Sequence, residues 1–259
     1  MKPTTTLITL GLLFSAGVSV QAATLFSETF DSYANGDLAT TVPGVTVANF
    51  GGTDSATVST AQALSGANSI RYTSDNVGSQ QPDLNFNFSS SVTAATTLVN
   101  PTLLISFSYQ KNSDNYDPNI WVMFGNQANA GFGNGNIALR NNGLNNFFGT
   151  VDPGFQFTGQ GPNWQTVNVA YTFTNNGTNI TGYTAAFTTS GGANSPSFSV
   201  TRTGITNITS IDSIRFQYRG AAGEVYLDNI SVVAIPEPST SALAALAALG
   251  LAFTRRRSA

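Results

Sequence analysis

Histidine and cysteine are both absent from the 259-residue chain. Without cysteine there is no disulfide framework, thiolate nucleophile or iron–sulfur site. Without histidine, a Ser-His-Asp triad and the usual zinc sites are excluded. Charged residues are also scarce, at 9% of the chain, whereas serine, threonine, asparagine and glycine are abundant, so the polarity comes from hydroxyls and amides. This composition suits strands and turns better than helices, and the length suits one large all-β domain with targeting segments.

The few charges are unevenly distributed along the chain. Lys2 lies at one end and Arg255, Arg256 and Arg257 lie at the other, which leaves six basic residues between them. Residues 23–234 contain all six of these basic residues and twelve acidic ones, so the domain itself is acidic. Because nucleic acid requires a surface of the opposite sign, no nucleic-acid partner is expected.

The N-terminus has the pattern of a secretory signal peptide. Lys2 precedes an apolar run from Leu7 to Val20, and Val20-Gln21-Ala22 places small residues at the cleavage positions. We expect residues 1–22 to form the signal peptide with its helix, and cleavage to follow Ala22. The alternative is a buried N-terminal helix.

The C-terminus has three parts in order. Pro236-Glu237-Pro238 comes first, an uncharged Ala/Leu-rich stretch follows at 239–254, and Arg255-Arg256-Arg257 comes last. The stretch is short for a bilayer span, but with snorkelling arginines it predicts a transmembrane helix whose basic end lies in the cytoplasm. An ordinary stop-transfer anchor is the alternative.

This tail, residues 235–259, resembles the PEP-CTERM sorting signal of Gram-negative bacteria. The resemblance implies that exosortase, a membrane protease-transpeptidase, reads Pro236, Glu237, Pro238, Arg255, Arg256 and Arg257. It also implies a transient inner-membrane anchor, delivery to the cell surface or beyond, and a host that builds exopolysaccharide-rich biofilms. Proteins with this tag differ in the domains that they carry, so the tag assigns no activity to the domain.

Residues 23–234 alternate strand patterns with turn residues and show no helical period. Apolar and polar residues alternate at 84–88, 105–109, 167–173 and 214–218, which predicts strands with one core face and one wet face. Turn signals such as Asn35-Gly36 separate the strands. The pattern predicts an all-β, antiparallel β-sandwich of the jelly-roll type. A barrel is less favoured because the first strand, 25–30, and the last, 224–233, are suited to pairing side by side.

The first and last strands carry the main candidate site. Their sequences, LFSETFDSY and GEVYLDNISV, resemble the ends of concanavalin-like and carbohydrate-binding jelly rolls. On each strand a carboxylate, Glu28 or Asp228, shares a face with apolar side chains, and an inward carboxylate is costly unless it is paired or holds a metal. The resemblance implies a structural calcium ion at such ends, and oxygen ligands suit calcium, so Glu28 and Asp228 are its candidate ligands.

The sequence also allows an alternative to this calcium site. Asp228 is predicted on the face of Tyr226, Ile230 and Val232, but Val225 and Leu227 make the opposite face apolar as well. The alternative interpretation is that Asp228 caps a backbone turn, while Glu28 pairs with an arginine or lies at the sheet edge.

Sugar binding requires exposed aromatic rings, and Tyr116 and Trp164 are the candidates. Trp121 lies in an apolar strand, where core packing is expected. Tyr116 lies between two aspartates in a segment typical of a solvated turn. Residues 125–162 have the composition of long loops, which are either functional or mobile.

Two function classes stay open. The first is an exported, non-catalytic cell-surface or matrix protein that binds exopolysaccharide and has no catalytic residue. The second is a secreted carbohydrate-active hydrolase with an Asp/Glu pair, for which Glu28 and Glu224 are the domain's two isolated glutamates. A cleft with two carboxylates about 5–9.5 Å apart would favour the enzyme. An aromatic-lined face with scattered acids would favour binding.

Overall fold

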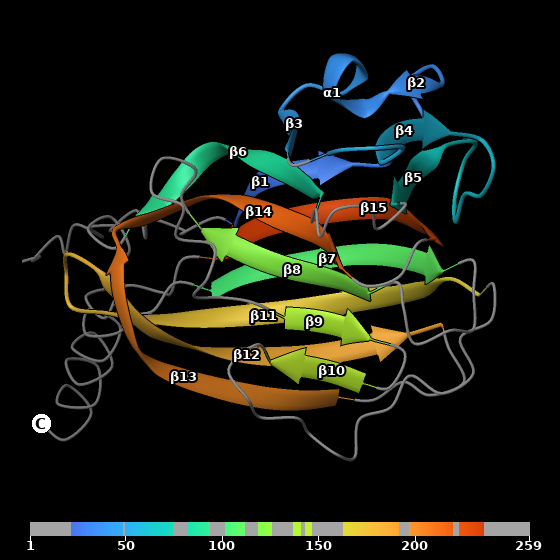
Figure 1. Cartoon of the computed structure of the whole chain (residues 1–259). Helices are drawn as coiled ribbons and strands as arrows, with labels where there is room; N and C mark the ends of the chain where they lie inside the picture. Colours follow the sequence, from blue (N-terminus) through green and yellow to red (C-terminus); the bar gives the residue numbers. More distant parts are fainter. Residues whose placement is uncertain are drawn as a thin grey trace, which may run out of the picture. The chain divides into compact units, whose positions relative to one another are not determined.

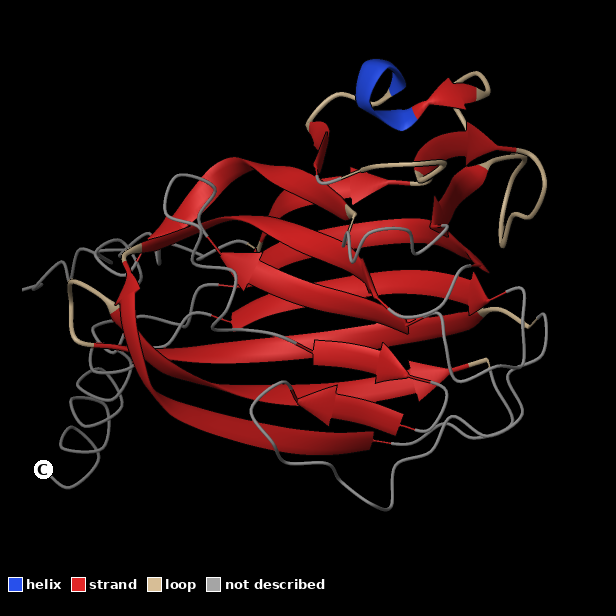
Figure 2. Ribbon diagram, in the orientation of Figure 1, coloured by secondary structure: helices blue, strands red, loops and turns tan. Residues whose placement is uncertain are grey.

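Strands make up almost all of the structure (Figures 1 and 2). The computed structural model describes residues 22–48, 50–74, 82–93, 102–111, 119–125, 137–140, 143–146, 163–191, 197–219 and 223–235. The larger sheet contains β1 (Ala23–Glu28), β2 (Gly36–Asp37), β4 (Ser55–Ser59), β5 (Ser69–Ser74), β7 (Thr102–Lys111), β11 (Gln165–Asn175), β12 (Ile180–Ser190), β13 (Ser197–Ile208) and β15 (Gly223–Ile235). The smaller sheet contains β3 (Val45–Ala48), β6 (Asp83–Thr93), β8 (Asn119–Gly125), β9 (Ile137–Arg140), β10 (Gly143–Asn146) and β14 (Ser210–Arg219). One short helix, α1 (Leu38–Thr41), follows β2.

The two sheets lie face to face as a sandwich (Figure 1). The larger sheet has the order β13-β12-β11-β7-β15-β5-β4-β2, with β1 also paired to β15, and the smaller has the order β10-β9-β8-β14-β6-β3. Strand pairs within both sheets are antiparallel. The predicted antiparallel β-sandwich is therefore confirmed.

Aromatic rings join the two sheets through the core. Phe216 of β14 contacts Phe107 of β7 with ring centroids 5.0 Å apart, and it contacts Phe86 of β6 at 5.4 Å, both edge-to-face. All three side chains are fully buried. Each such burial stabilises the fold by about 1.5–3 kcal/mol. The core face of each strand follows the alternation seen in the sequence, as predicted for β6, β7, β11 and β14.

The alternation predicted that the opposite face of β6 and β14 is exposed to water, but the described polar residues at the paired ends of these two strands are buried. Asp83, Asn85 and Gln217 are only 0%, 6% and 7% exposed. Asp83 lies directly across from Gln217 and Asn85 lies directly across from Arg215 in the β6–β14 register, so these polar groups pair between strands instead of facing water. Alternation alone separates two faces and does not show what covers each of them.

The first and last strands are neighbours, as predicted. Phe26 lies opposite Val232 and Glu28 lies opposite Ile230 in the β1–β15 pair. β15 has a bulge after Asp228, where the register with β7 shifts and Asn229 adopts φ 52°.

The bulge explains why both faces of the last strand are apolar. Val225 and Leu227 enter the core before it, and Ile230 and Val232 enter the core after it. The extra residue shifts the side-chain alternation by one. The prediction that Asp228 shares a face with Ile230 and Val232 is therefore wrong.

The predicted targeting segments lie almost wholly outside the described residues. This holds for residues 1–21 of the signal peptide, for Pro236, Glu237 and Pro238, for the helix at 239–254, and for the three terminal arginines. Among the residues that the structure describes, no helix is long and apolar enough to cross a membrane.

Candidate functional site

Asp228 lies at the bulge, where β15 changes its partner from β5 to β1. Its fully buried carboxylate accepts hydrogen bonds from the N–H groups of Leu64 (2.9 Å), Ser65 (3.3 Å) and Asn229 (2.7 Å). Burial raises the pKa of Asp228, the three N–H groups oppose this rise, and the nearby charge of Asp31 adds to it. Asp228 thus binds the loop that contains Leu64 and Ser65 at the point where β15 stops pairing with β5 and starts pairing with β1.

Glu28 ends β1 in a similar way. Its Oε1 accepts the N–H groups of Thr29 and Phe30, both at 2.9 Å, and its Oε2 accepts the hydroxyl of Tyr33 at 2.9 Å. Phe30 adopts φ 64°, so the carboxylate supports a backbone reversal just after the strand. Among the described residues, no arginine pairs with Glu28.

Asp31 is the third carboxylate of this region. Its Oδ1 accepts the N–H groups of Ala67 (2.7 Å) and Asn68 (3.1 Å), and these bonds lower the pKa of Asp31. Gly66 has φ +65°, and a Cβ there would collide with the Asp31 carboxylate. The loop therefore approaches Asp31 closely enough to require glycine.

These three carboxylates, Glu28, Asp31 and Asp228, form what we call the terminal-strand clasp. Its oxygens are directed at N–H and O–H donors, which supports the interpretation that Asp228 caps a backbone turn. In the described part of the chain, no group of three or more His, Cys, Asp or Glu side chains is arranged to hold a metal. The calcium site at Glu28 and Asp228 stays a prediction.

A second polar group lies on the outer face of the smaller sheet, and we call it the β6–β14 cluster. Arg215 donates through Nε to Asn85 Oδ1 at 2.8 Å and forms an ion pair with Asp83 at 3.2 Å. Gln217 donates to the other oxygen of Asp83 at 2.7 Å. A fully buried Asp83 is thus neutralised by Arg215, as a buried charge requires.

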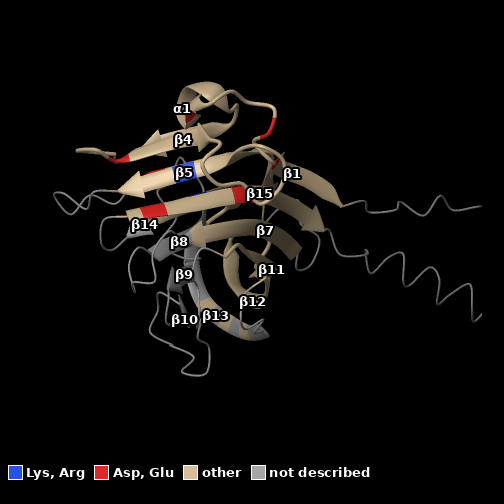
Figure 3. Cartoon of the chain, turned by 90° about the vertical axis from the view of Figure 1, so that its right-hand side faces the viewer, with Lys and Arg blue, Asp and Glu red and all other residues tan. Residues whose placement is uncertain are grey.

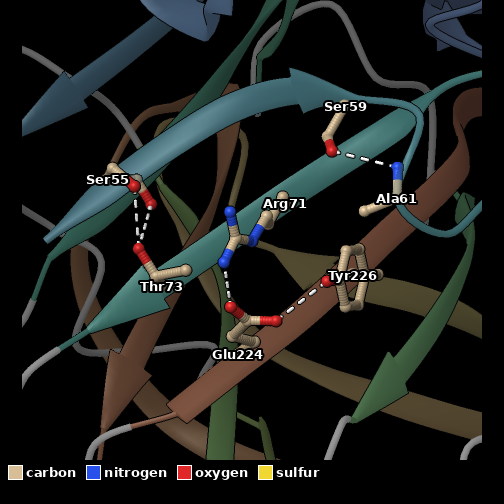
Figure 4. Close-up of polar contacts among 7 residues, drawn as sticks. All are labelled: Ser55, Ser59, Ala61, Arg71, Thr73, Glu224 and Tyr226. Carbon is tan, nitrogen blue, oxygen red and sulfur yellow. Dashed lines mark hydrogen bonds and ion pairs between the residues drawn. The ribbon is translucent and has the colours of Figure 1, made fainter.

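The outer face of the larger sheet carries a third polar group (Figure 4). Arg71 of β5 forms an ion pair with Glu224 of β15, and the hydroxyl of Tyr226 donates to Glu224 at 2.8 Å. Burial and the hydrogen bond to Glu224 raise the pKa of Tyr226. Arg71 lies opposite both Tyr226 and Thr57, so this group continues across to β4.

A pocket of about 240 Å³ lies beside β4, at the edge of the sandwich. We call it the seam pocket because its lining comes from β3 of the smaller sheet and from β2 and β4 of the larger. Three lining residues are apolar and four are polar: Val47, Phe50, Ala56, Asp37, Asp54, Ser55 and Thr57. Red segments at α1, β4 and β15 and a blue one on β5 show how the charges are spread on this side (Figure 3).

The local structure fixes the main groups of the seam pocket. Phe50 stacks on the buried Tyr72 with ring centroids 5.9 Å apart, which anchors one face of its half-buried ring. Asp37 is the N-cap of α1 and accepts the N–H of Ala39 at 2.9 Å. Asp54 accepts the N–H of Gly51 at 3.2 Å. A mixed apolar and hydrogen-bonding lining of this kind suits a small organic ligand.

Of the two predicted sugar-binding aromatics, the structure describes only Trp164, and Trp164 does not line this pocket. Trp164 is half-buried directly before β11, and Tyr116 lies outside the described residues. Sequence reasoning missed the seam pocket because the β2–β4 pairing, which places Asp37 opposite Thr57, joins segments that are distant in sequence. The turn signal at Asn35-Gly36 was the available hint, since β2 begins at Gly36.

Comparison with known proteins identifies the tail and the fold. The sequence matches the PEP-CTERM protein-sorting motif over residues 234–257. The chain is therefore an exported protein that is sorted by exosortase and is membrane-associated in transit. No curated protein matches the chain in sequence.

Several solved structures resemble the domain. The marine PL-14 alginate lyase from Aplysia kurodai has a TM-score of 0.53 and 13% identity, over 81% of this chain and 98% of that chain. Endo-beta-1,4-glucuronan lyase from the fungus Trichoderma reesei has a TM-score of 0.46 and 14% identity, over 77% of this chain and 93% of that chain. Lectin II from Ulex europaeus has a TM-score of 0.45 and 12% identity, over 82% of this chain and 99% of that chain. The likeness to the alginate lyase, whose TM-score exceeds 0.5, supports the predicted jelly-roll type at the level of the fold alone.

Proposed function

We propose that this chain is an exported cell-surface or matrix protein that binds exopolysaccharide without cleaving it. The tag delivers the domain, and the domain supplies the binding site. The seam pocket is the observation that carries the proposal, because it combines an aromatic ring with hydroxyl and carboxylate groups. A sugar ring needs both kinds of partner, since its C–H face is apolar and its hydroxyls form hydrogen bonds.

The size of the pocket and the setting of Phe50 support a single sugar unit as the ligand. A pocket of about 240 Å³ is below the usual range for drug-sized ligands, about 300–1,000 Å³. The ring of Phe50 is fixed by Tyr72 and so loses little freedom when a ligand stacks on it. Stacking on one sugar of a long polymer gives weak binding per site, and many copies on a surface strengthen it by avidity.

Polysaccharide binding can be measured directly with the purified full-length protein. We expect retarded migration in gels that contain a binding polysaccharide, and loss of this retardation in Phe50→Ala. Phe88→Ala is the matched control, because Phe88 is also half-buried against the core but does not line the pocket. Equal retardation of the Phe50→Ala and wild-type proteins would contradict the proposal.

A hydrolase is the second candidate, and one observation favours it. Asp37 and Asp54 both line the seam pocket, and glycoside cleavage uses a pair of carboxylates. If the protein is a hydrolase, we expect it to release reducing ends from a polysaccharide that it binds. We expect Asp37→Asn and Asp54→Asn to lose this activity. Binding without release of reducing ends would instead support the non-catalytic function.

A further inference from the structure

The charge of the seam pocket restricts the sugars that it accepts. Two of its described lining residues are aspartates and none is basic. Arg71, which lies opposite Thr57, is already paired with Glu224. An acidic sugar would meet uncompensated repulsion here, whereas a protonated amine would meet attraction.

Asp37 is positioned to receive such an amine. Its Oδ1 holds the N-terminus of α1, and its Oδ2 has no hydrogen-bond partner within the described residues. Asp37 is exposed, so a ligand can reach this oxygen. Asp54 adds a second carboxylate on the same pocket, and charge-assisted hydrogen bonds of this kind are roughly twice as strong as neutral ones.

The apolar lining argues for an organic cation and against a metal ion. Calcium takes 6–8 oxygen ligands, whereas Val47, Phe50 and Ala56 offer the pocket no side-chain oxygen. The Phe50 ring attracts a cation placed over its face and also packs against the C–H groups of a sugar. The pocket thus matches a ligand that has a flat apolar side, several hydroxyls and one positive charge.

We infer that the seam pocket binds an amino-sugar unit with a free, protonated amine in an exopolysaccharide. This inference rests on the proposed function and names its ligand class. N-acetylated and neutral sugars bind more weakly because they lack the charge. Uronates bind most weakly because they are negatively charged, like the pocket.

Calorimetry with the purified full-length protein tests the inference. The probes are a tetramer of β-1,4-linked glucosamine, its fully N-acetylated form and a tetramer of a uronic acid. We expect the glucosamine tetramer to bind at least about tenfold more tightly than the N-acetylated one, as expected for one added charge-assisted bond. Added salt should reduce this preference.

Two conservative variants remove the charges without removing the local structure. Asp37→Asn keeps a good N-cap for α1, and Asp54→Asn keeps an oxygen for the N–H of Gly51. Each should reduce the preference for the free amine to about threefold or less, while affinity for the N-acetylated tetramer changes by less than about twofold. Asp212→Asn on β14 removes the same charge elsewhere and should leave the preference intact.

The outcomes separate this inference from the proposed function. Equal affinity for the two tetramers, lost in Phe50→Ala, would overturn the amino-sugar inference and leave polysaccharide binding in place. Tighter binding of the uronic acid tetramer would also overturn it. If none of the probes or polysaccharides bound, the proposed function and the inference would both fail.

Discussion

At the scale of single residues, Asp31 and Asp228 hold the same loop, but their pKa values are shifted in opposite directions. Asp31 is exposed, and its two backbone hydrogen bonds lower its pKa. Asp228 is buried, and its desolvation outweighs three hydrogen bonds and raises its pKa. The environment of each carboxylate, and not its number of hydrogen bonds, therefore decides the direction of the shift.

The raised pKa of Asp228 predicts a pH dependence of stability. Between the ordinary pKa of about 4 and the raised value, the folded state binds more protons than the unfolded state, so acidification stabilises folding through this group. The free energy of unfolding of the wild type, minus that of Asp228→Asn, should rise as the pH falls from 7 toward about 4. The opposing contribution of Asp31 is lost on acidification but is present in both proteins. Urea denaturation across this range checks the sign, and a falling difference would contradict it.

The calcium prediction is also tested at this scale. A calcium ion at Glu28 and Asp228 would offset the mutual repulsion of the clasp carboxylates and so raise the thermal unfolding midpoint. We expect a chelator to reverse this rise, and Glu28→Ala or Asp228→Ala to abolish it. If calcium leaves the midpoint of the wild type unchanged, the hydrogen bonds alone hold the clasp.

At the scale of elements, the bulge of β15 marks where this strand exchanges one neighbour for another within the larger sheet. Before the bulge β15 pairs with β5, and after it β15 pairs with β1. Asn229 carries the positive φ of the bulge, in a region of backbone conformation that asparagine tolerates better than most residues. The loop at 64–68 is then fixed over this junction by Asp228 and Asp31.

Two substitutions at Asn229 test the bulge. Asn229→Gly should change the free energy of unfolding by less than about 0.5 kcal/mol, because glycine adopts positive φ freely. Asn229→Val should cost about 1–3 kcal/mol, because a β-branched residue is strained there. Urea denaturation of both variants measures the difference. A valine variant as stable as the glycine variant would show that the bulge is absent or that it relocates.

The sequence predicted those elements whose signals are local. Alternation identified β6, β7, β11 and β14, and the predicted pairing of the first and last strands is confirmed. The bulge was visible only as two apolar faces on one strand, and choosing between them needed the register. The seam pocket depended on the pairing of β2 with β4 and on the position of Phe50, neither of which any periodicity in the sequence encodes.

At the scale of the whole molecule, the sorting motif and the proposed binding site belong to different parts of the chain. The sorting motif occupies residues 234–257, whereas the seam pocket is built from residues 37–57. Changes in one part should therefore leave the function of the other part intact.

Changes to the sorting motif should alter location and not binding. In a variant with Pro236, Glu237 and Pro238 all replaced by alanine, we expect the unprocessed chain to accumulate in the inner-membrane fraction, because exosortase no longer reads the motif. Phe50→Ala is the control and should be exported normally. Cell fractionation followed by immunoblotting measures both, and normal release of the triple variant would contradict the prediction.

The central claim is that the seam pocket is where a polysaccharide binds. Chemical-shift mapping of the isotopically labelled protein, titrated with the glucosamine tetramer, tests it most directly. The account predicts that the largest shifts occur at Asp37, Phe50, Asp54, Ser55 and Thr57 and that they vanish in Phe50→Ala. Shifts confined to the β6–β14 cluster or to the clasp, with the pocket residues unmoved, would contradict it.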